Sequence, residues 1–162
     1  MIIGVTGDTH NNLKNIKKIC SIFNENGVDL VIHTGDISLP KSLSAFKDLN
    51  CALKAVLGNN DIEEKEGLLK ESNNFKCEIF HEPLFLELKG IKIGVYHHPD
   101  LIDEFSLSEN NLILHGHTHR YKLEKIKNCV VFNPGECAGM LKGKNQVGLI
   151  DLKNLSPEVI KF

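Results

Sequence analysis

Three short apolar segments in the N-terminal part of the chain each end at a glycine followed by a carboxylate or an amide. The segments are residues 1–6, 28–33 and 51–57, and the polar residues after their glycines are Asp8, Asp36 and Asn59. Apolar runs of this length between turn signals are typical of strands buried on both faces of a parallel sheet. The carboxyl ends of parallel strands lie at one edge of the sheet, so these polar side chains should meet there.

Helical patterns separate the three predicted strands. Apolar residues recur at helical spacing from Leu13 to Phe23, Asn11 and Asn12 are plausible caps, and Gly27 ends a helix that runs to about residue 26. A second, shorter helix is expected over residues 41–49. The alternation of strand and helix predicts a parallel sheet with right-handed crossovers.

The second half of the chain has more strands than helices. The segments Leu84–Leu88 and Ile91–Tyr96 flank Lys89-Gly90 and predict a hairpin. A short helix is expected within residues 100–111, and further strands are expected at residues 112–114, 121–126, 129–132, 146–152 and 159–162. We therefore predict one α/β domain over residues 1–162, built from two stacked mixed β-sheets flanked by helices.

Composition excludes some classes of protein but does not indicate a function. The net charge of −2 argues against a nucleic-acid-binding surface. Arg120 is the only arginine, which argues against a site built from bidentate arginine clamps on phosphate. The five cysteines form no C-x-x-C pair, so reduced thiols in the cytoplasm are expected. The N-terminus has neither a basic leader nor a long apolar run, so neither secretion nor membrane insertion is expected.

Histidines accompany the polar strand ends in short clusters. They occur as Asp8-Thr9-His10, His97-His98 and Gly116-His117-Thr118-His119. Taken alone, each cluster has an ordinary explanation, such as a helix cap, a tight turn or a surface histidine. All of them follow expected strands, however, and imidazole, carboxylate and amide groups are common metal ligands.

The whole series resembles the motifs of the calcineurin-like metallophosphoesterases, and most closely the small bacterial and archaeal phosphodiesterase branch. The resemblance extends to the turn Asn133-Pro134-Gly135. It implies that Asp8, His10 and His119 hold one divalent cation and that Asn59, His97 and His117 hold a second. It further implies that Asp36 bridges the two cations.

The resemblance also implies hydrolysis of a small phosphate diester. Ligands of this type suit Mn or Ni best, with Fe or Zn as alternatives. Two cations about 3.5–4 Å apart convert a shared water to hydroxide, which attacks phosphorus in line with the leaving oxygen. They also withdraw charge from the phosphoryl oxygens, so an arginine clamp is not required.

The sequence departs from the family pattern at two motifs. Many members carry a histidine at the position of Asn60, where it is thought to protonate the leaving oxygen, and an amide cannot do so. We predict His98 as the replacement proton donor and Asp61 as a hydrogen-bond acceptor beside the ligands. Glu136 stands where the family usually has serine, and we expect it to face solvent.

Other readings remain open at this point. A non-catalytic scaffold that resembles the retromer subunit of the same family is the main alternative, but scaffold members tend to lose a ligand and this chain keeps all seven. A nuclease or a protein phosphatase would usually carry extra recognition segments. Association into a homo-oligomer is possible. Of the remaining histidines, His33 and His115 are expected in the core and His81 at the surface.

Overall fold

Two β-sheets form the centre of the computed structural model, which describes residues 1–162. The first sheet has the strand order β11 (Ser156–Lys161), β10 (Gln146–Asp151), β1 (Ile2–Thr6), β2 (Leu30–His33), β3 (Ala52–Val56) and β4 (Cys77–Phe80). The second has the order β5 (Leu84–Leu88), β6 (Ile91–Val95), β7 (Leu112–Leu114), β9 (Cys129–Asn133) and β8 (Lys122–Ile126). Both sheets mix parallel and antiparallel pairs, as predicted.

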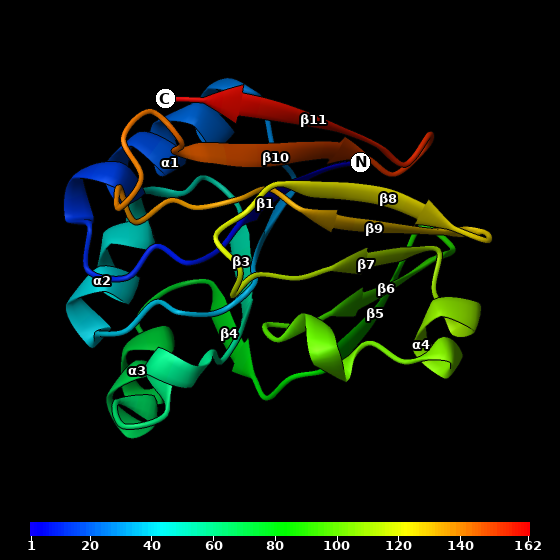
Figure 1. Ribbon diagram of the computed structural model, residues 1–162. Coiled ribbons are helices and arrows are strands. Elements are labelled where there is room, and N and C mark those ends of the chain that lie inside the picture. The colour runs from blue at the N-terminus through cyan, green and yellow to red at the C-terminus, as the bar shows by residue number, and fades with distance from the viewer.

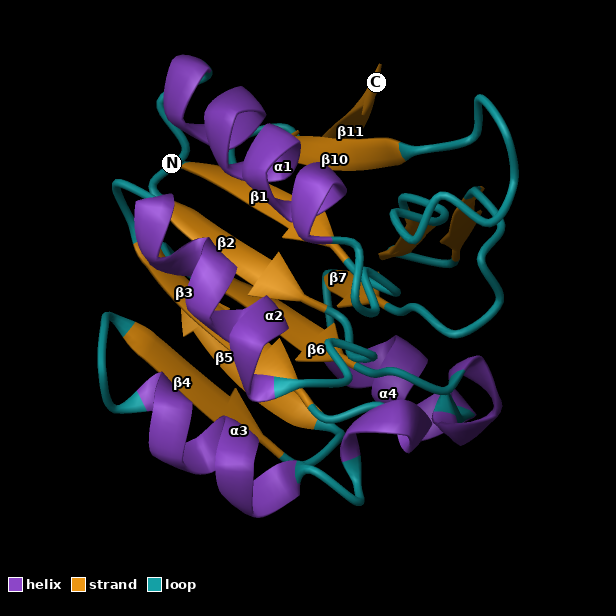
Figure 2. Cartoon of the chain, turned by 90° about the vertical axis from the view of Figure 1, so that its left-hand side faces the viewer, coloured by secondary structure: helices purple, strands orange, loops and turns teal.

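Helices cover the outer faces of both sheets (Figure 1). Figure 2 shows α1 (Leu13–Glu25), α2 (Pro40–Ser44) and α3 (Lys65–Ser72) lying over the six-stranded sheet. The short helix α4 (Glu104–Glu109) lies beside the five-stranded sheet on the opposite side of the molecule (Figure 1). The order helix, sheet, sheet, helix confirms the predicted fold class.

Strands β1, β2 and β3 run parallel and end at nearly the same level. Thr6 pairs with His33, and His33 pairs with Ala55 in the next strand. The loops that leave these strands therefore start from one edge of the sheet. This edge carries the residues that the sequence placed after the three glycines.

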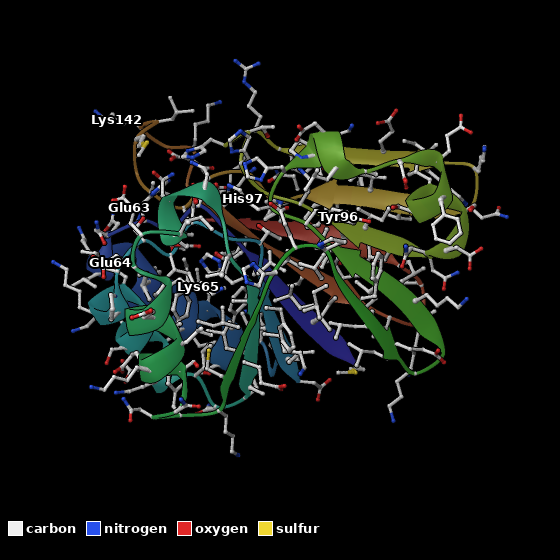
Figure 3. The ribbon with its side chains drawn as sticks, turned by 90° about the horizontal axis from the view of Figure 1, so that it is seen from below. Glu63, Glu64, Lys65, Tyr96, His97 and Lys142 are labelled. Carbon is white, nitrogen blue, oxygen red and sulfur yellow. The ribbon has the colours of Figure 1, made fainter.

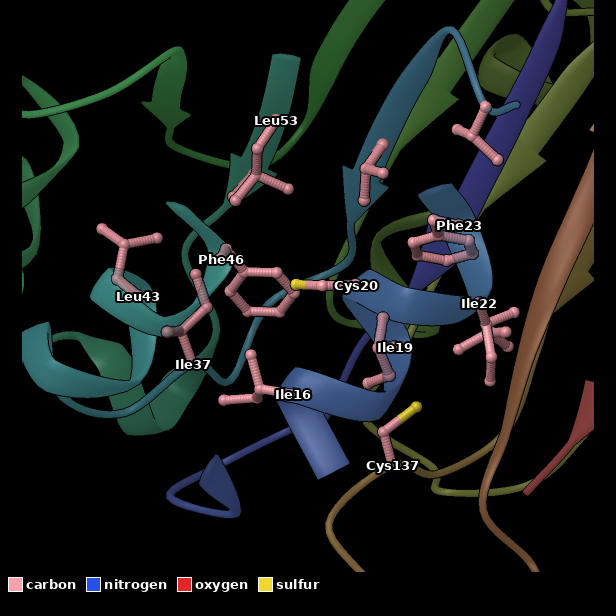
Figure 4. Packing of buried hydrophobic residues seen from close by; sticks show 14 of the residues in the cluster. Ile16, Ile19, Cys20, Ile22, Phe23, Ile37, Leu43, Phe46, Leu53 and Cys137 are labelled. Carbon is pink, nitrogen blue, oxygen red and sulfur yellow. The ribbon is translucent and has the colours of Figure 1, made fainter. Parts of the chain in front are cut away.

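Separate apolar clusters hold the layers together. One cluster of 16 buried residues joins α1 and α2 to the first sheet, and Figure 4 shows Phe23 and Phe46 among its members. A second cluster of 13 buried residues, including Ile3, Ile32 and Phe132, fills the space between the sheets. Because alternate residues of β1 and β2 point into different clusters, these strands are apolar throughout.

The structure adds an element pair that the sequence reading did not predict. The helix α3 and the strand β4 follow the third strand, and β4 pairs parallel with β3 at the sheet edge. Strand β4 is only partly buried, so its apolar pattern is weak. The last strand, β11, begins at Ser156 rather than at residue 159. No helix of the chain is both long and apolar enough to cross a membrane.

Candidate metal centre

Backbone hydrogen bonds fasten the motif loops to one another. The amide of Asp8 donates to the carbonyl of Gly35 at 2.9 Å, and the amide of His10 donates to the carbonyl of Asp36 at 2.9 Å. The amide of His117 donates to the Asp8 carboxylate at 3.1 Å. Segments far apart in the sequence thereby meet at the edge formed by β1, β2 and β3.

Five of the seven predicted ligands have a left-handed backbone conformation. Their φ angles are 49° at Asp8, 45° at His10, 61° at Asp36, 66° at His117 and 56° at His119. Residues with a Cβ atom are uncommon in this region, and strain of this kind collects at functional sites. The backbone is bent so that these side chains turn inward.

Gly58 allows the loop after β3 to approach the loop after β2. A Cβ atom at Gly58 would lie 2.2 Å from Oδ1 of Asp36, a distance that no side chain can occupy. Glycine before Asn59 is therefore a requirement of close packing at this centre.

The predicted ligands of the first cation form one compact group. Asp8, His10 and His119 each offer a donor atom, and the three atoms lie within 4.8 Å of one another. Nε2 of His119 lies 3.6 Å from Oδ1 of Asp8 and 3.5 Å from Nε2 of His10. The other ring nitrogen of His10 contacts the Ser38 hydroxyl at 3.2 Å, which orients its ring.

The predicted ligands of the second cation place nitrogen and oxygen atoms with unshared electron pairs close to one another. Nδ1 of His97 lies 2.9 Å from the Thr34 carbonyl and donates its proton there, while burial lowers the pKa of His97. The neutral ring then has no proton on Nε2. That nitrogen lies 3.0 Å from Oδ1 of Asn59 and 3.2 Å from Nδ1 of His117. A cation between these atoms would relieve their repulsion, so the donor set fits a metal ion.

Asp36 lies between the two groups of predicted ligands. Its Oδ2 atom is 3.8 Å from Nε2 of His10, and its Oδ1 atom is 3.5 Å from Nε2 of His97. Burial opposes ionisation of Asp36, but the charge that His97 carries when it is protonated and two hydrogen bonds from Asn60 outweigh burial and lower the pKa of Asp36. Asp36 is thus an ionised carboxylate with one oxygen toward each group.

Asn60 and Asp61 hold this arrangement in place. The Asn60 amide nitrogen Nδ2 donates to Oδ2 of Asp36 at 2.7 Å. The Asp61 carboxylate accepts backbone hydrogen bonds from Asp36, Ser38 and Gly58 at 2.6–2.9 Å. Asp61 is therefore a hydrogen-bond acceptor beside the predicted ligands, as expected.

Negative charge gathers in the buried part of the centre. Burial and the neighbouring Asp36 raise the pKa of Asp8 to about 8. The chain's salt bridges give these two carboxylates only histidine partners. Burial lowers the pKa of His10 as well as that of His97, so both rings are neutral donors. Neutral imidazoles beside desolvated carboxylates are the groups that bind a dication.

The raised pKa of Asp8 can be tested by measuring the stability of metal-free protein as a function of pH. Asp8 binds a proton more tightly when folded than when unfolded, so stability should fall as pH rises from 3.8 to about 8. Each pKa unit corresponds to about 1.4 kcal/mol, so the loss should reach a few kcal/mol. Urea unfolding of chelator-treated protein should show this loss, whereas the Asp8→Asn variant should lack it. Equal pH dependence in both proteins would contradict the assignment.

His98 has a partly buried carboxylate partner that the sequence did not predict. Oε1 of Glu82 lies 2.5 Å from Nδ1 of His98, and Oε2 accepts the backbone amides of His97 and His98. The His98 ring packs 4.5 Å from the ring of His117, measured between centroids. Figure 3 marks His97 in the loop that follows β6. The sequence does not reveal this pair, because Glu82 and His98 become neighbours only when the chain folds.

The expectation that Glu136 faces solvent is wrong. Its side chain is fully buried, and its carboxylate accepts the amide of Leu141 at 2.6 Å. Oε2 of Glu136 also lies 3.5 Å from Nδ1 of His119, opposite the nitrogen that faces Asp8. The loop of residues 134–145 folds over the glutamate and closes it off from water. Glu136 thereby orients a predicted ligand.

The remaining histidines lie where they were expected. His33 is buried, and its Nε2 atom lies 2.9 Å from the Thr9 hydroxyl. His115 is buried, and its Nδ1 atom lies 3.1 Å from the carbonyl of Gly116. His81 is exposed and contacts Lys65. None of these three belongs to the groups of donor atoms at the centre.

The chain is similar to known proteins in sequence and in fold. The chain is 34% identical over 156 residues to the phosphodiesterase MJ0936 of Methanocaldococcus jannaschii, which covers 93% of each protein. Its fold matches that of a solved archaeal phosphodiesterase with a TM-score of 0.87 and 32% identity, over 100% of both chains. It also matches Vps29 of Chaetomium thermophilum with a TM-score of 0.71, over 99% of this chain and 95% of that one. That match has 15% identity and shows a shared fold alone.

The family profile decides the assignment. The calcineurin-like phosphoesterase superfamily domain matches residues 1–155, a range that includes every predicted ligand. The resemblance inferred from the motifs is thereby confirmed. This chain belongs to the calcineurin-like phosphoesterase superfamily.

Proposed function

We propose that this chain is a phosphodiesterase that hydrolyses small phosphate diesters with a bridging hydroxide activated by two divalent cations. Asp8, His10 and His119 would hold one cation, and Asn59, His97 and His117 the other, with Asp36 shared between them. Manganese or nickel is the expected metal, with iron or zinc as alternatives. The similarity to the phosphodiesterase of M. jannaschii supports this assignment of activity.

The position of Asp36 is the observation that carries the proposal. Its two oxygens face His10 and His97, which belong to different groups of donor atoms. A shared carboxylate keeps two dications close despite their mutual repulsion. When bound, the cations would lower the pKa of a water molecule and withdraw charge from the phosphoryl oxygens.

The side chains around Asp36 supply orientation. Asn60 donates to Asp36 and keeps the plane of its carboxylate fixed, so the amide has a structural task rather than that of an acid. The Thr34 carbonyl and Glu136 turn one nitrogen of His97 and of His119 toward the centre. Prior orientation of this kind reduces reorganisation during the reaction.

We assign proton donation to the leaving oxygen to His98. Its side chain is 28% exposed and lies beside the centre, and Glu82 fixes its ring by contact with Nδ1. A ring nitrogen of His98 lies within 4.8 Å of donor atoms of His97 and His117, so the ring is within reach of a substrate at the centre. Nδ1 paired with a carboxylate is the arrangement that keeps a histidine ring in one orientation.

The His98→Ala variant should therefore lose activity in a manner that depends on the leaving group. A positioned general acid contributes about 10²–10⁴-fold, mainly for alkoxide leaving groups that need a proton. Hydrolysis of an alkyl diester should fall by about a hundredfold or more, whereas a p-nitrophenyl diester should lose far less. Two ions per chain should remain by metal analysis. Equal losses on both substrates would remove His98 from this role, and loss of an ion would make it a ligand.

The second candidate is a scaffold without catalysis, as in the retromer subunit of the family. The likeness of fold to Vps29 supports it, but that likeness does not extend to the sequence. Metal analysis together with an assay on bis-p-nitrophenyl phosphate separates the two. Two ions per chain and turnover support the phosphodiesterase, whereas inactivity with every metal supports the scaffold.

The cellular setting that we propose is the cytoplasm. All five cysteines are free thiols, and Cys20, Cys129 and Cys137 are buried. Free thiols are typical of a reducing compartment. The net charge of −2 is consistent with a small substrate rather than with nucleic acid.

A further inference from the structure

Two cavities adjoin the candidate metal centre, one at each group of predicted ligands. The first has a volume of about 420 Å³, and His119 and Glu136 form the wall that it shares with the centre. The second has a volume of about 460 Å³, and Asn59 and His98 form its shared wall. A phosphate diester has two organic groups on one phosphorus, so a centre with two adjoining cavities can take one group in each.

The first cavity carries positive charge. Arg120, Lys144 and Lys161 line it and come from three separate segments of the chain. None of the three forms a salt bridge, unlike Lys47, Lys54, Lys92 and Lys122. We call this space the cationic cavity. Unpaired cations that converge on one hollow are suited to an anionic group.

The carboxylate of Glu136 does not cancel this charge. It is fully buried, and its oxygens accept the amides of Leu141 and Met140 at 2.6 and 3.3 Å. Its remaining neighbour is Nδ1 of His119, at 3.5 Å. The glutamate is therefore directed at the loop and at a predicted ligand, and the three cations remain available to a substrate.

The walls of the cationic cavity also suit an organic body. Tyr121 is 50% exposed, and its ring stands edge-on to Phe132 with 6.2 Å between centroids. Val159 and Leu141 complete the apolar part of the lining. The covering loop extends outward to Lys142, which Figure 3 marks at the outside of the molecule. A sugar or a ring could pack against Tyr121 while its charged group meets the lysines.

The second cavity is lined by acidic residues and by no lysine or arginine. Glu63 and Glu82 line it together with Ile62, whose side chain is 56% exposed. We call this space the acidic cavity. His98, the proposed proton donor, belongs to its wall, so the group that leaves should occupy this side.

We propose that the substrate is an asymmetric diester whose retained group carries a second anionic group, such as a phosphate, in the cationic cavity. The uncharged leaving group lies in the acidic cavity. Water adds to phosphorus, the bond from phosphorus to the leaving oxygen breaks, and that oxygen takes a proton. This inference rests on the proposed function and adds the class of substrate to it.

Two substrates that differ by one phosphate test the inference directly. The first is p-nitrophenyl thymidine 5′-phosphate, and the second carries an additional 3′-phosphate on the same thymidine. Manganese-loaded protein should prefer the second substrate by about tenfold or more in kcat/KM, because charge-assisted hydrogen bonds are the strong ones. Added salt should weaken the preference.

Matched lysine variants locate the source of the preference. The double variant Lys144→Ala/Lys161→Ala should hydrolyse both thymidine substrates at nearly equal rates, because it lacks the two lysines that would meet the extra phosphate. The control Lys17→Ala/Lys18→Ala removes the same charge from the exposed side of α1 and should keep the preference. A preference that survives the first double variant would overturn the inference.

Different results would overturn the proposed phosphodiesterase activity and the proposed class of substrate. If bis-p-nitrophenyl phosphate is hydrolysed but the extra phosphate brings no preference, the substrate class is wrong and the phosphodiesterase stands. If no diester is hydrolysed, calorimetric titration with thymidine 3′,5′-bisphosphate decides the cavity by itself. Weaker binding to the Lys144→Ala/Lys161→Ala variant than to the control supports it, and equal binding overturns it.

Discussion

Removal of divalent cations is expected to lower the hydrolysis of bis-p-nitrophenyl phosphate by about a thousandfold or more. The centre contains carboxylates and neutral imidazoles, and the salt bridges of Asp8 and Asp36 involve only histidines. Without cations, no positive group at the centre can stabilise charge on the phosphoryl oxygens. Loss of a single electrostatic contact of this kind costs about 10²–10³-fold in other enzymes, and the proposed mechanism would lose two cations together. Dialysis against a chelator followed by a rate assay measures the effect.

Restoration provides the control for metal removal. Addition of manganese or nickel should return the activity, and circular dichroism should show that the stripped protein remains folded. The order in which metals restore the rate then identifies the preferred ion. A rate that chelation leaves unchanged, with metal analysis confirming that the ions are gone, would falsify the two-metal mechanism.

The Asp36→Asn variant is expected to lose activity to a similar extent. Asparagine has the shape of aspartate but offers one oxygen and no charge, so it cannot serve both His10 and His97. The cations would then lack the carboxylate that offsets their repulsion. We expect about a thousandfold lower kcat on bis-p-nitrophenyl phosphate and fewer than two ions per chain.

A carboxylate outside the centre serves as the matched control. Asp48 is exposed in the 3₁₀ helix Ala45–Asp48, and Asp48→Asn removes the same charge from a residue that belongs to none of the groups of donor atoms. This variant should keep two ions and the normal rate. If Asp36→Asn also retained both ions and most of its activity, Asp36 would not be a bridging ligand.

The sequence was sufficient to predict the strands that precede the predicted ligands. Strands β1, β2 and β3 are buried on both faces, so their apolar runs stand out from the turns that follow. By contrast, β4 lies at the sheet edge and is only half buried, so that neither an apolar run nor a regular alternation marks it. The same reasoning explains why α3, which buries only Leu68 and Ser72, was missed.

The burial and the contacts of two glutamates could not be predicted from the sequence. Glu136 follows a turn and would ordinarily face water, but the loop of residues 134–145 folds over it. Glu82 contacts His98 only because the loops before β5 and after β6 lie side by side. No local sequence pattern marks either contact, since each depends on how the folded chain places another segment.

The sequence by itself determined the family, the predicted ligands and the edge of the sheet at which they should lie. Periodicity and glycine position are local properties, and they follow from the geometry of a strand and its turn. The tertiary structure decided that Asp36 faces both groups of donor atoms and that a cationic and an acidic cavity adjoin them. These features arise when distant segments pack together, so the distances between them exist only in the folded chain.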